Sequence, residues 1–341
     1  MSNKAAVIGA GSWGTALAAR VLSRNFEQVT LWCRRQQLAN AINLERSNKE
    51  YLPGVMLPSN VRATSDLRSA VQGKDLLVFS IPSAHLRGVL KQVAPLLAKP
   101  ADLVNTAKGF EPDTLQRLSV VIAEEIGGKA RAIAVLSGPN HAEEVGRDMP
   151  SASVISSEDA EAAIRLQDAF FTSNFRVYTN MDIVGVELGG ALKNIIALAA
   201  GIADGMGFGD NTKAMLMTRG LGEMVRLGRA LGADPRTFSG LAGIGDLIAT
   251  CTSKHSRNWN AGYKIGQGQK LQEVTGGTHM VIEGAFATQA AYKMKSKLGV
   301  DMPITDALYR VLFADEDPRT AMNEMMNRVR KHEYEDLAFA N

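Results

Sequence analysis

The glycine-rich segment GAGSWG at residues 9–14 constrains the fold of this chain more than any other feature. It follows the short apolar run Ala5–Ile8 and precedes a stretch with helical periodicity, so its glycines lie in a strand–turn–helix unit. In such a unit Gly9 permits the tight turn, Gly11 lets a phosphate approach the backbone, and Gly14 lets the helix pack close to the strand. The free N–H groups and the dipole of the helix can then hold a pyrophosphate. The pattern predicts a dinucleotide site, and the alternative is a glycine-rich turn without a ligand.

The end of the second predicted strand bears on which dinucleotide binds. The strand Val29–Cys33 is followed by Arg34 and Arg35, where an acidic residue usually receives the ribose hydroxyl of NAD. A carboxylate would repel a 2′-phosphate, whereas arginine attracts one through charge-assisted hydrogen bonds. The pair therefore favours NADP, or acceptance of both cofactors; the alternative is a solvated charge pair on a surface loop. Cys33 is expected to be a small buried residue rather than a redox thiol.

Strands and helices alternate through the first 180 residues, which predicts a doubly wound parallel sheet of the Rossmann type. We expect strands at Ala5–Ile8, Val29–Cys33, Leu76–Ile81, Leu103–Ala107 and Ile133–Leu136, with further strands at Ala152–Ile155 and Phe175–Tyr178. We expect helices at Thr15–Leu22, Leu86–Leu97, Leu115–Ile126 and Ala160–Phe171.

From Val184 onward the periodicity is helical and no strand is expected. The predicted helices are Leu188–Ile202, Ala214–Leu231, Phe286–Leu298, Ile304–Phe313 and Ala321–Val329. We therefore predict a dinucleotide-binding Rossmann domain at residues 1–180 and an all-helical substrate-binding and catalytic domain at residues 181–341.

Polar segments follow several predicted strands, at the sheet edge where open parallel sheets bind ligands. Ser80–Pro82 closes one strand, Lys108 follows another, and Gly138–Asn140 follows a third. Lys108 is suited to neutralising a phosphate, and an exposed lysine without a ligand is an equally good account.

Lys193 is the most informative residue of the second half, because it interrupts an apolar, small-residue stretch, GGALKNII at 189–196. An apolar interior disfavours an ammonium, so burial would push a lysine toward proton exchange near neutral pH. Gly189 lies one helical turn earlier on the same face, where the missing side chain would let a substrate approach. A general acid that protonates a carbonyl oxygen needs this placement. The alternative is a lysine that snorkels from a helix edge.

Two later segments carry polar groups that could act with Lys193. Asp246 follows flexible glycines, where its carboxylate could cap a helix or orient the lysine. The tripeptide Ser256-Arg257-Asn258 brings together a hydroxyl, a guanidinium and an amide, which suits a phosphate clamp. Taken alone, the tripeptide would more often be an ordinary loop.

Composition excludes several other classes. A net charge of +3 over 341 residues argues against a nucleic-acid binder. The five histidines have no metal-ligand spacing, so we expect no metal site, and two cysteines cannot form a disulfide framework. The N-terminus shows no signal peptide, and the most apolar stretch, Asn194–Ala203, is too short to span a bilayer. We therefore expect a cytoplasmic protein without a membrane span.

Taken together, these motifs resemble the NAD(P)-dependent glycerol-3-phosphate dehydrogenase family of the bacterial type. They occur in the family's order along nearly the whole chain, and ELGGALKN combined with the later SRN is highly specific. The matching stretches are Gly9–Ala18, Ala107–Glu111, Ser137–Pro139, Glu187–Asn194, Gly205–Asn211, Thr218–Gly222, Leu241–Asp246, Ser256–Asn258 and Met302–Thr305.

The resemblance implies reversible interconversion of sn-glycerol 3-phosphate and dihydroxyacetone phosphate, which supplies glycerophospholipid synthesis. It also implies a small phosphorylated substrate and a homodimer. Lys193 matches the family's proton-transfer position. Substrate-contacting positions fall on Lys108, Gly138, Asn140, Asp246, Ser256, Arg257 and Asn258. Cofactor-contacting positions fall on Ser12, Trp13, Arg34, Arg35, Lys108, Ala142, Arg257, Val281 and Glu283.

Two rival functions remain open from the sequence. A β-hydroxyacid dehydrogenase also pairs a Rossmann domain with helices and a lysine, and would differ in its substrate. A nucleotide-sensing regulator would bind the cofactor without turnover and would not need Lys193 beside a phosphate clamp.

Overall fold

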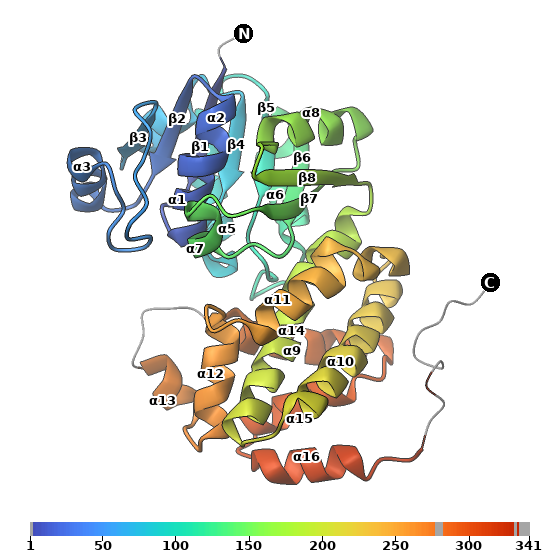
Figure 1. Cartoon of the computed structure of the whole chain (residues 1–341). Helices are drawn as coiled ribbons and strands as arrows, with labels where there is room; N and C mark the ends of the chain where they lie inside the picture. Colours follow the sequence, from blue (N-terminus) through green and yellow to red (C-terminus); the bar gives the residue numbers. More distant parts are fainter. Residues whose placement is uncertain (1–2, 277–281, 331–332, 334–341) are drawn as a thin grey trace. The chain divides into compact units, whose positions relative to one another are not determined.

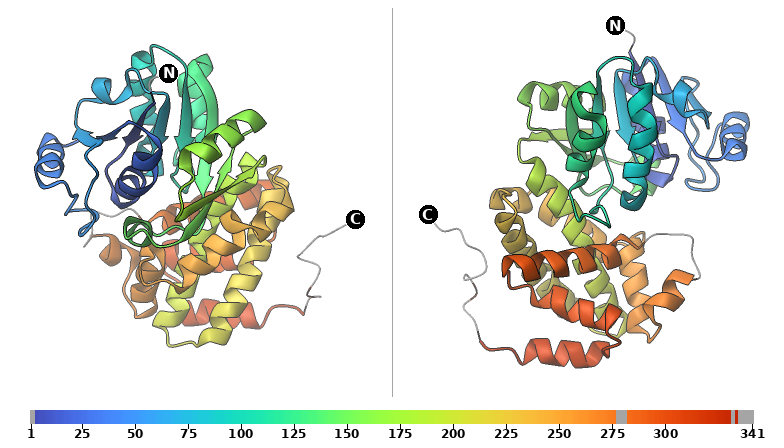
Figure 2. Two further views of the ribbon diagram at one scale, coloured as in Figure 1. Left: turned by 45° about the horizontal axis from the view of Figure 1, so that its top comes forward. Right: turned by 180° about the vertical axis from the view of Figure 1, so that it is seen from behind.

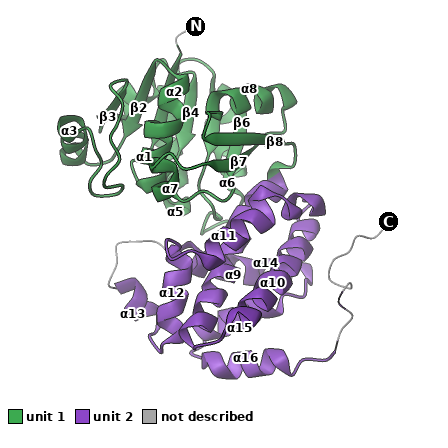
Figure 3. Cartoon of the chain, viewed as in Figure 1, with its two compact units in different colours: residues 1–183 green, residues 184–341 purple. Residues whose placement is uncertain are grey.

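The computed structural model describes residues 3–276, 282–330 and 333 of the chain. The chain divides into two compact units, residues 1–183 (unit 1) and residues 184–341 (unit 2), shown in different colours in Figure 3. This division lies close to residue 180, where the sequence changes from alternating to helical periodicity.

Unit 1 contains an eight-stranded sheet in the order β3-β2-β1-β4-β5-β6-β7-β8 (Figure 1). The strands are β1 (Lys4–Ile8), β2 (Gln28–Trp32), β3 (Val61–Thr64), β4 (Leu76–Phe79), β5 (Ala101–Asn105), β6 (Ala130–Ser137), β7 (Ser151–Ser156) and β8 (Phe175–Asn180). Neighbouring strands are parallel except β6 and β7, which are antiparallel. The expected doubly wound fold is confirmed, with a mixed, mostly parallel sheet.

Helices cover both faces of this sheet, as Figure 1 and the view from behind in Figure 2 show. Successive residues of a strand point to opposite faces, so Ala5 and Val7 of β1 lie in one core and Ala6 and Ile8 in the other. The helical segments are α1 (Ser12–Ala16), η1 (Leu17–Leu22), α2 (Ser23–Asn25), α3 (Gln36–Glu45), α4 (Leu67–Val71), α5 (Ser83–Val93), η2 (Ala94–Leu96), α6 (Leu118–Ile126), η3 (Gly127–Lys129), α7 (Ala142–Gly146) and α8 (Ala160–Phe170).

The structure corrects the sequence-based assignment at several points. Strand β3 and helices α3 and α4 were not expected, because each is short or has a weak apolar face. The helix expected at Leu115–Ile126 begins only at Leu118, since Leu115 has a left-handed backbone with φ of 61°. The helix after the glycine-rich turn contains a π-helical stretch, η1, at Leu17–Leu22.

Every regular element among the described residues of unit 2 is helical, as expected. Its segments are α9 (Ile183–Gly205), α10 (Asp210–Ala230), η4 (Pro235–Ser239), η5 (Leu241–Gly245), α11 (Asp246–Thr252), α12 (Arg257–Gly266), α13 (Leu271–Gly276), α14 (Glu283–Leu298), α15 (Pro303–Phe313) and α16 (Pro318–Met326). Helices α11, α12 and α13 were not expected from the sequence, because they are short or interrupted by glycine.

Helix α9 is longer than the sequence indicated. It is the one helix among the described residues that is long and apolar enough to cross a membrane, yet 89% of its most apolar window is buried inside the fold. An apolar helix surrounded by protein is the core element of its unit, so α9 packs the other helices around it.

Helices α9 and α12 cross with their backbones in direct contact. A Cβ atom on Gly201 or Gly205 of α9 would overlap a carbonyl oxygen of α12, at Trp259 or Tyr263. A Cβ atom on Gly262 or Gly266 of α12 would in turn overlap a carbonyl oxygen of α9. Two glycine pairs, each with a spacing of four residues, therefore let the two helices approach more closely than any side chain would allow.

Glu223 of α10 is a buried carboxylate that caps the N-terminus of α15. Its Oε1 accepts a hydrogen bond from the Ile304 N–H, and its Oε2 accepts from the Thr305 N–H (3.0 Å) and hydroxyl (2.8 Å). Burial raises the pKa of Glu223 to about 7, although these donors and the nearby Arg226 act in the opposite direction.

The raised pKa predicts a pH dependence of stability. A carboxyl group whose pKa is higher in the folded chain contributes most below its ordinary value of 4.5, and loses that contribution as the pH rises through about 7. Glu223→Gln removes the titration. The stability advantage of the parent chain over this variant, measured by urea denaturation, should be larger at about pH 5 than at about pH 8. An equal advantage at both pH values would contradict the assignment. The exposed Glu273→Gln serves as the control.

Candidate functional site

The three glycines of the first turn have different surroundings in unit 1. Gly9 has φ of +121° and leaves no room for a side chain against the Ser80 carbonyl. A Cβ atom on Gly14 would overlap the Gly9 carbonyl and lie 3.1 Å from the Val7 side chain. Nothing lies within 4 Å of the corresponding position on Gly11. This arrangement agrees with the role expected for each glycine, and the open side of the turn is at Gly11.

The N-terminus of α1 fits a pyrophosphate. Gly11 is its N-cap and supplies no capping side chain, so the first helical N–H groups are available to an anion. Ser12 and Trp13 are the first two residues of the helix. The Ser12 hydroxyl donates to the Tyr51 carbonyl at 2.6 Å, and the Trp13 ring packs against Phe175 with centroids 6.3 Å apart.

The two arginines after β2 differ in their contacts. Arg34 and Arg35 are both exposed, and Arg35 makes an ion pair with Glu50, with Nη2 and Oε1 2.5 Å apart. The hydrogen bond from Arg35 to Glu50 raises the pKa of Arg35. Cys33 is buried, as expected, and burial raises the pKa of its thiol, which makes it a poor nucleophile.

Lys108 of unit 1 contacts the loop after β6, and Asn140, which belongs to that loop, contacts β7. The Lys108 ammonium donates to the Gly138 carbonyl at 2.9 Å. The Asn140 amide donates to the Ala152 carbonyl at 2.9 Å, and its Oδ1 accepts from the Ser153 hydroxyl. Gly138 has φ of +144°, so the turn that links these residues requires glycine. Lys108, Gly138 and Asn140 therefore lie close together, and their contacts with a substrate stay a prediction.

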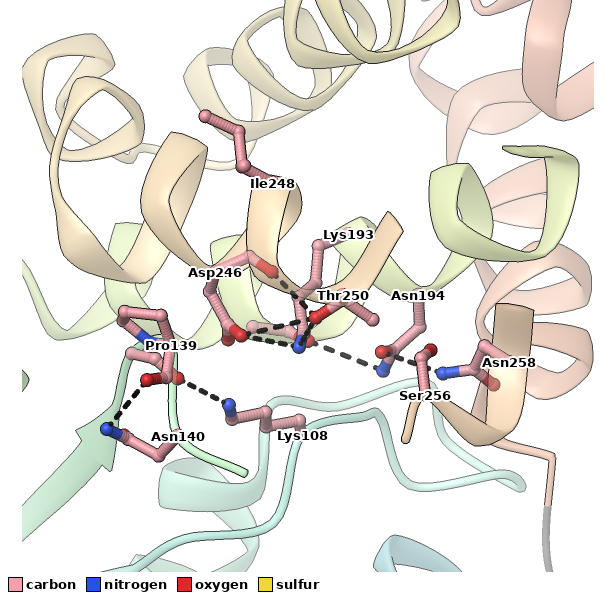
Figure 4. A network of polar contacts seen from close by, with 12 residues as sticks. Lys108, Pro139, Asn140, Lys193, Asn194, Asp246, Ile248, Thr250, Ser256 and Asn258 are labelled. Carbon is pink, nitrogen blue, oxygen red and sulfur yellow. Dashed lines mark hydrogen bonds and ion pairs between the residues drawn. The ribbon is translucent and has the colours of Figure 1, made fainter. Parts of the chain in front are cut away.

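Lys193 is buried in unit 2, with 5% of its surface exposed, so it does not snorkel from a helix edge. Its ammonium nitrogen lies 2.6 Å from Asp246 Oδ1 and 2.5 Å from the Thr250 hydroxyl oxygen (Figure 4). The Thr250 hydroxyl donates in turn to the Asp246 main-chain carbonyl at 2.6 Å. The carboxylate favours the charged ammonium, which is the form that can donate a proton.

The position of Asp246 in helix α11 places its side chain beside Lys193. Gly245 is the N-cap of α11, and Asp246 is its first residue, with its side chain directed at Lys193. Thr250 follows one turn later on the same face, and Ile248 points to the opposite side in Figure 4. Asp246 therefore contacts the lysine, and its role in orienting the amine stays a prediction.

The role expected for Gly189 is wrong. A Cβ atom there would overlap the Ala242 carbonyl, so the backbone of η5 fills the space that a substrate was expected to use. Gly189 instead lets η5 approach α9, which brings the following helix α11 and Asp246 to Lys193.

The tripeptide at residues 256–258 forms the start of α12. The Ser256 hydroxyl oxygen caps the helix by accepting from the Trp259 N–H at 3.1 Å, which leaves its proton for another acceptor. Arg257 is exposed at the first helical position. Asn258 is buried: its amide donates to Asn194 Oδ1 at 2.9 Å, and its oxygen accepts from the Gly284 N–H at 2.9 Å. A ten-residue helix that begins in this way can bind an anion.

The remaining expected contacts lie at helix starts or outside the described residues. Ala142 is the buried first residue of α7, and Glu283 is the first residue of α14. Val281 lies outside the described residues.

Asn194 and Thr250 of these networks were not singled out from the sequence, nor was Asn48, a buried residue whose amide donates to the Ala10 carbonyl. Thr250 lies four residues after Asp246, and this helical spacing is the only signal that could have identified it. Asn194 follows Lys193 directly and links α9 to Asn258. Asn48 lies in a loop without a motif.

Thr250 offers a direct test of the lysine network. Thr250→Val removes one acceptor from Lys193 while keeping the volume of the side chain. Enzymatic turnover should therefore fall by about tenfold, the usual value of a hydrogen bond to a charged group. Thr250→Ser keeps the hydroxyl and should retain most of the activity. Equal kcat values for the valine and serine variants would show that the hydroxyl has no role.

Comparison with known proteins places both halves of the chain in one family. Residues 4–163 match the family described as NAD-dependent glycerol-3-phosphate dehydrogenase N-terminus, and residues 182–323 match the corresponding C-terminus. The chain is 54% identical over 333 residues to a glycerol-3-phosphate dehydrogenase [NAD(P)+] of Geobacillus kaustophilus, covering 97% of this chain and 96% of that protein. It is 53% identical over 341 residues to the protein of the same name in Pelotomaculum thermopropionicum, covering 100% and 97%. The crystal structure of glycerol-3-phosphate dehydrogenase from Coxiella burnetii has a TM-score of 0.90 at 36% identity and covers 96% of this chain and 99% of that one.

Proposed function

This chain belongs to the NAD-dependent glycerol-3-phosphate dehydrogenase family, and from that premise we propose that it interconverts sn-glycerol 3-phosphate and dihydroxyacetone phosphate with NAD(P). The reaction supplies glycerol 3-phosphate for glycerophospholipid synthesis. In this proposal unit 1 carries the glycine-rich turn of the dinucleotide site, and unit 2 carries the phosphate clamp and the proton donor.

The observation that carries the proposal is the buried ammonium of Lys193, held by Asp246 and Thr250. A buried lysine with a carboxylate partner is a costly arrangement for a helical core, and a buried pair is weak evidence for stability alone. A reaction that must protonate an alkoxide provides a reason for it. A protein that only sensed the nucleotide would have no use for this amine.

When bound, the reduced nicotinamide supplies a hydride for the ketone carbon. Lys193 donates a proton to the oxygen that develops negative charge, and Asp246 orients the amine. In the reverse direction the same amine takes the proton from the hydroxyl of glycerol 3-phosphate. The proton therefore moves between the substrate oxygen and Lys193 Nζ in both directions.

Phosphate binding would orient the substrate at a distance from the reacting carbon. We assign this role to Ser256, Arg257 and Asn258 at the start of α12, where the helix dipole and a guanidinium both favour an anion. Lys108, Gly138 and Asn140 are assigned to further substrate contacts.

The dinucleotide is assigned to the glycine-rich turn with Ser12 and Trp13, to Arg34, Arg35, Lys108 and Ala142, and to Arg257, Val281 and Glu283. The two arginines after β2 support NADP as the favoured cofactor. A cytoplasmic homodimer is part of the same proposal and rests on the family resemblance.

The test is the oxidation of NADPH and of NADH by the purified full chain with dihydroxyacetone phosphate, followed by absorbance. We expect turnover with both cofactors and a higher kcat/KM for NADPH. A parallel series with β-keto acids, the oxidised forms of β-hydroxyacids, tests the rival function. Faster reduction of a keto acid than of dihydroxyacetone phosphate would overturn the proposal.

A further inference from the structure

A carboxylate of unit 1 lies near the C-terminal end of β2, although no acidic residue follows that strand directly in the sequence. Glu50 belongs to the loop between α3 and β3, and its Oε1 lies 2.5 Å from Arg35 Nη2. Both side chains are about half exposed, 47% for Glu50 and 49% for Arg35, so a ligand can reach the pair. The carboxylate therefore lies beside the position where a Rossmann fold usually has its ribose-binding acid.

The chain segment that carries Glu50 is anchored to the phosphate-binding turn. Asn48 is fully buried, and its amide donates to the Ala10 carbonyl at 2.9 Å and to the Thr15 hydroxyl at 2.8 Å. On the other side of Glu50, the Tyr51 carbonyl accepts from the Ser12 hydroxyl at 2.6 Å. These contacts fix the position of Glu50 relative to the glycine-rich turn.

We propose that Glu50 determines the choice between NAD and NADP by sharing Arg35 with the ribose of the cofactor. This inference rests on the proposed function, because it concerns the same dinucleotide site. With NAD, the Glu50 carboxylate accepts hydrogen bonds from the ribose hydroxyls and keeps Arg35 paired. With NADP, the 2′-phosphate takes the Arg35 guanidinium, and Glu50 must leave it.

The chemistry of the pair permits this exchange. An exposed ion pair is weak, because water screens its charges and two flexible side chains must be held together. A phosphate offers arginine a doubly charged partner with bidentate geometry. Glu50 therefore opposes NADP by competition and by repulsion without excluding it, and the site accepts both cofactors.

The experiment measures binding of the full chain to NAD⁺, NADP⁺, 5′-AMP and 2′-phospho-AMP by isothermal titration calorimetry, without turnover. Glu50→Gln should tighten the binding of NADP⁺ and 2′-phospho-AMP by about tenfold and weaken that of NAD⁺ by about threefold. Glu45→Gln is the matched control, because Glu45 lies on the adjoining helix α3 and pairs with Lys49 at 3.2 Å instead of Arg35. It removes the same charge and should change the ratio of the NAD⁺ and NADP⁺ dissociation constants by less than about twofold.

A double variant tests the coupling between the two residues. In an Arg35→Gln background, Glu50→Gln should change the NADP⁺ dissociation constant by less than about threefold, since the guanidinium under competition is absent. A ratio of NAD⁺ to NADP⁺ dissociation constants that is unchanged by Glu50→Gln, or shifted equally by Glu45→Gln, would overturn the inference while leaving the proposed function intact. A parent chain that binds neither dinucleotide would overturn both.

Discussion

Lys193→Ala should lower kcat for reduction of dihydroxyacetone phosphate by about 10²–10⁴-fold, the usual contribution of a general acid. The amine is the proton donor assigned to the reaction, and its contacts with Asp246 and Thr250 orient it. Steady-state oxidation of NADPH checks the effect. Lys264→Ala, which removes an exposed lysine of α12, should leave kcat within about twofold of the parent.

Loss of folding could imitate loss of chemistry in this variant, so a second substitution is needed. Lys193→Ala leaves the Asp246 carboxylate buried without its ion-pair partner, which should cost about 3–5 kcal/mol of stability. Adding Asp246→Asn removes that charge and should recover much of the Tm. Turnover should stay low in the double variant. Recovery of turnover together with Tm would assign Lys193 a structural role only.

Gly262→Ala should lower the free energy of unfolding of unit 2 by about 3 kcal/mol. The new Cβ atom would overlap the Leu198 carbonyl of α9. A side chain could rotate to relieve such a clash, but the backbone of a helix cannot. Helices α9 and α12 would have to separate. Because α12 begins with Ser256-Arg257-Asn258, KM for dihydroxyacetone phosphate should rise as well. Circular dichroism during urea denaturation measures the first effect.

Gly88→Ala is the control for this substitution. Gly88 lies within helix α5, and nothing lies within 4 Å of the position that a Cβ atom would take there. Alanine at this site should stabilise unit 1 by up to about 1 kcal/mol, because it favours the helix and meets no neighbour. If Gly262→Ala were as harmless as Gly88→Ala, the close crossing of α9 and α12 would be wrong.

The sequence predicted those features of the fold and the site that depend on residues close together in the chain. The strand–turn–helix unit at residues 9–14 follows from the glycine spacing, and the helical second half follows from its periodicity. The burial of Lys193 follows from the apolar residues around it. Each of these depends on contacts within a few turns of chain.

Contacts between distant segments could not be predicted in the same way. Asp246 lies 53 residues after Lys193 in the sequence. Whether its carboxylate caps α11 or contacts Lys193 depends on the residue at which α11 begins. Gly189 was assigned to the substrate, yet the backbone of η5 fills its open side. Glu50 and Asn48 belong to a loop without periodicity or motif, so only the folded chain shows what they contact. A glycine in the sequence shows where a side chain is absent, but it does not show which segment of the folded chain, or which ligand, occupies that space.

The separation of these groups between the two units has a consequence for how such a protein can change. Arg35 and Glu50 belong to residues 1–183, whereas Lys193, Asp246 and Thr250 belong to residues 184–341. On the proposed roles, substitutions of Arg35 and Glu50 change the preference between NAD and NADP and leave the proton donor Lys193 and its partners unchanged. Redesign of coenzyme preference in this protein can therefore be attempted in one half of the gene alone.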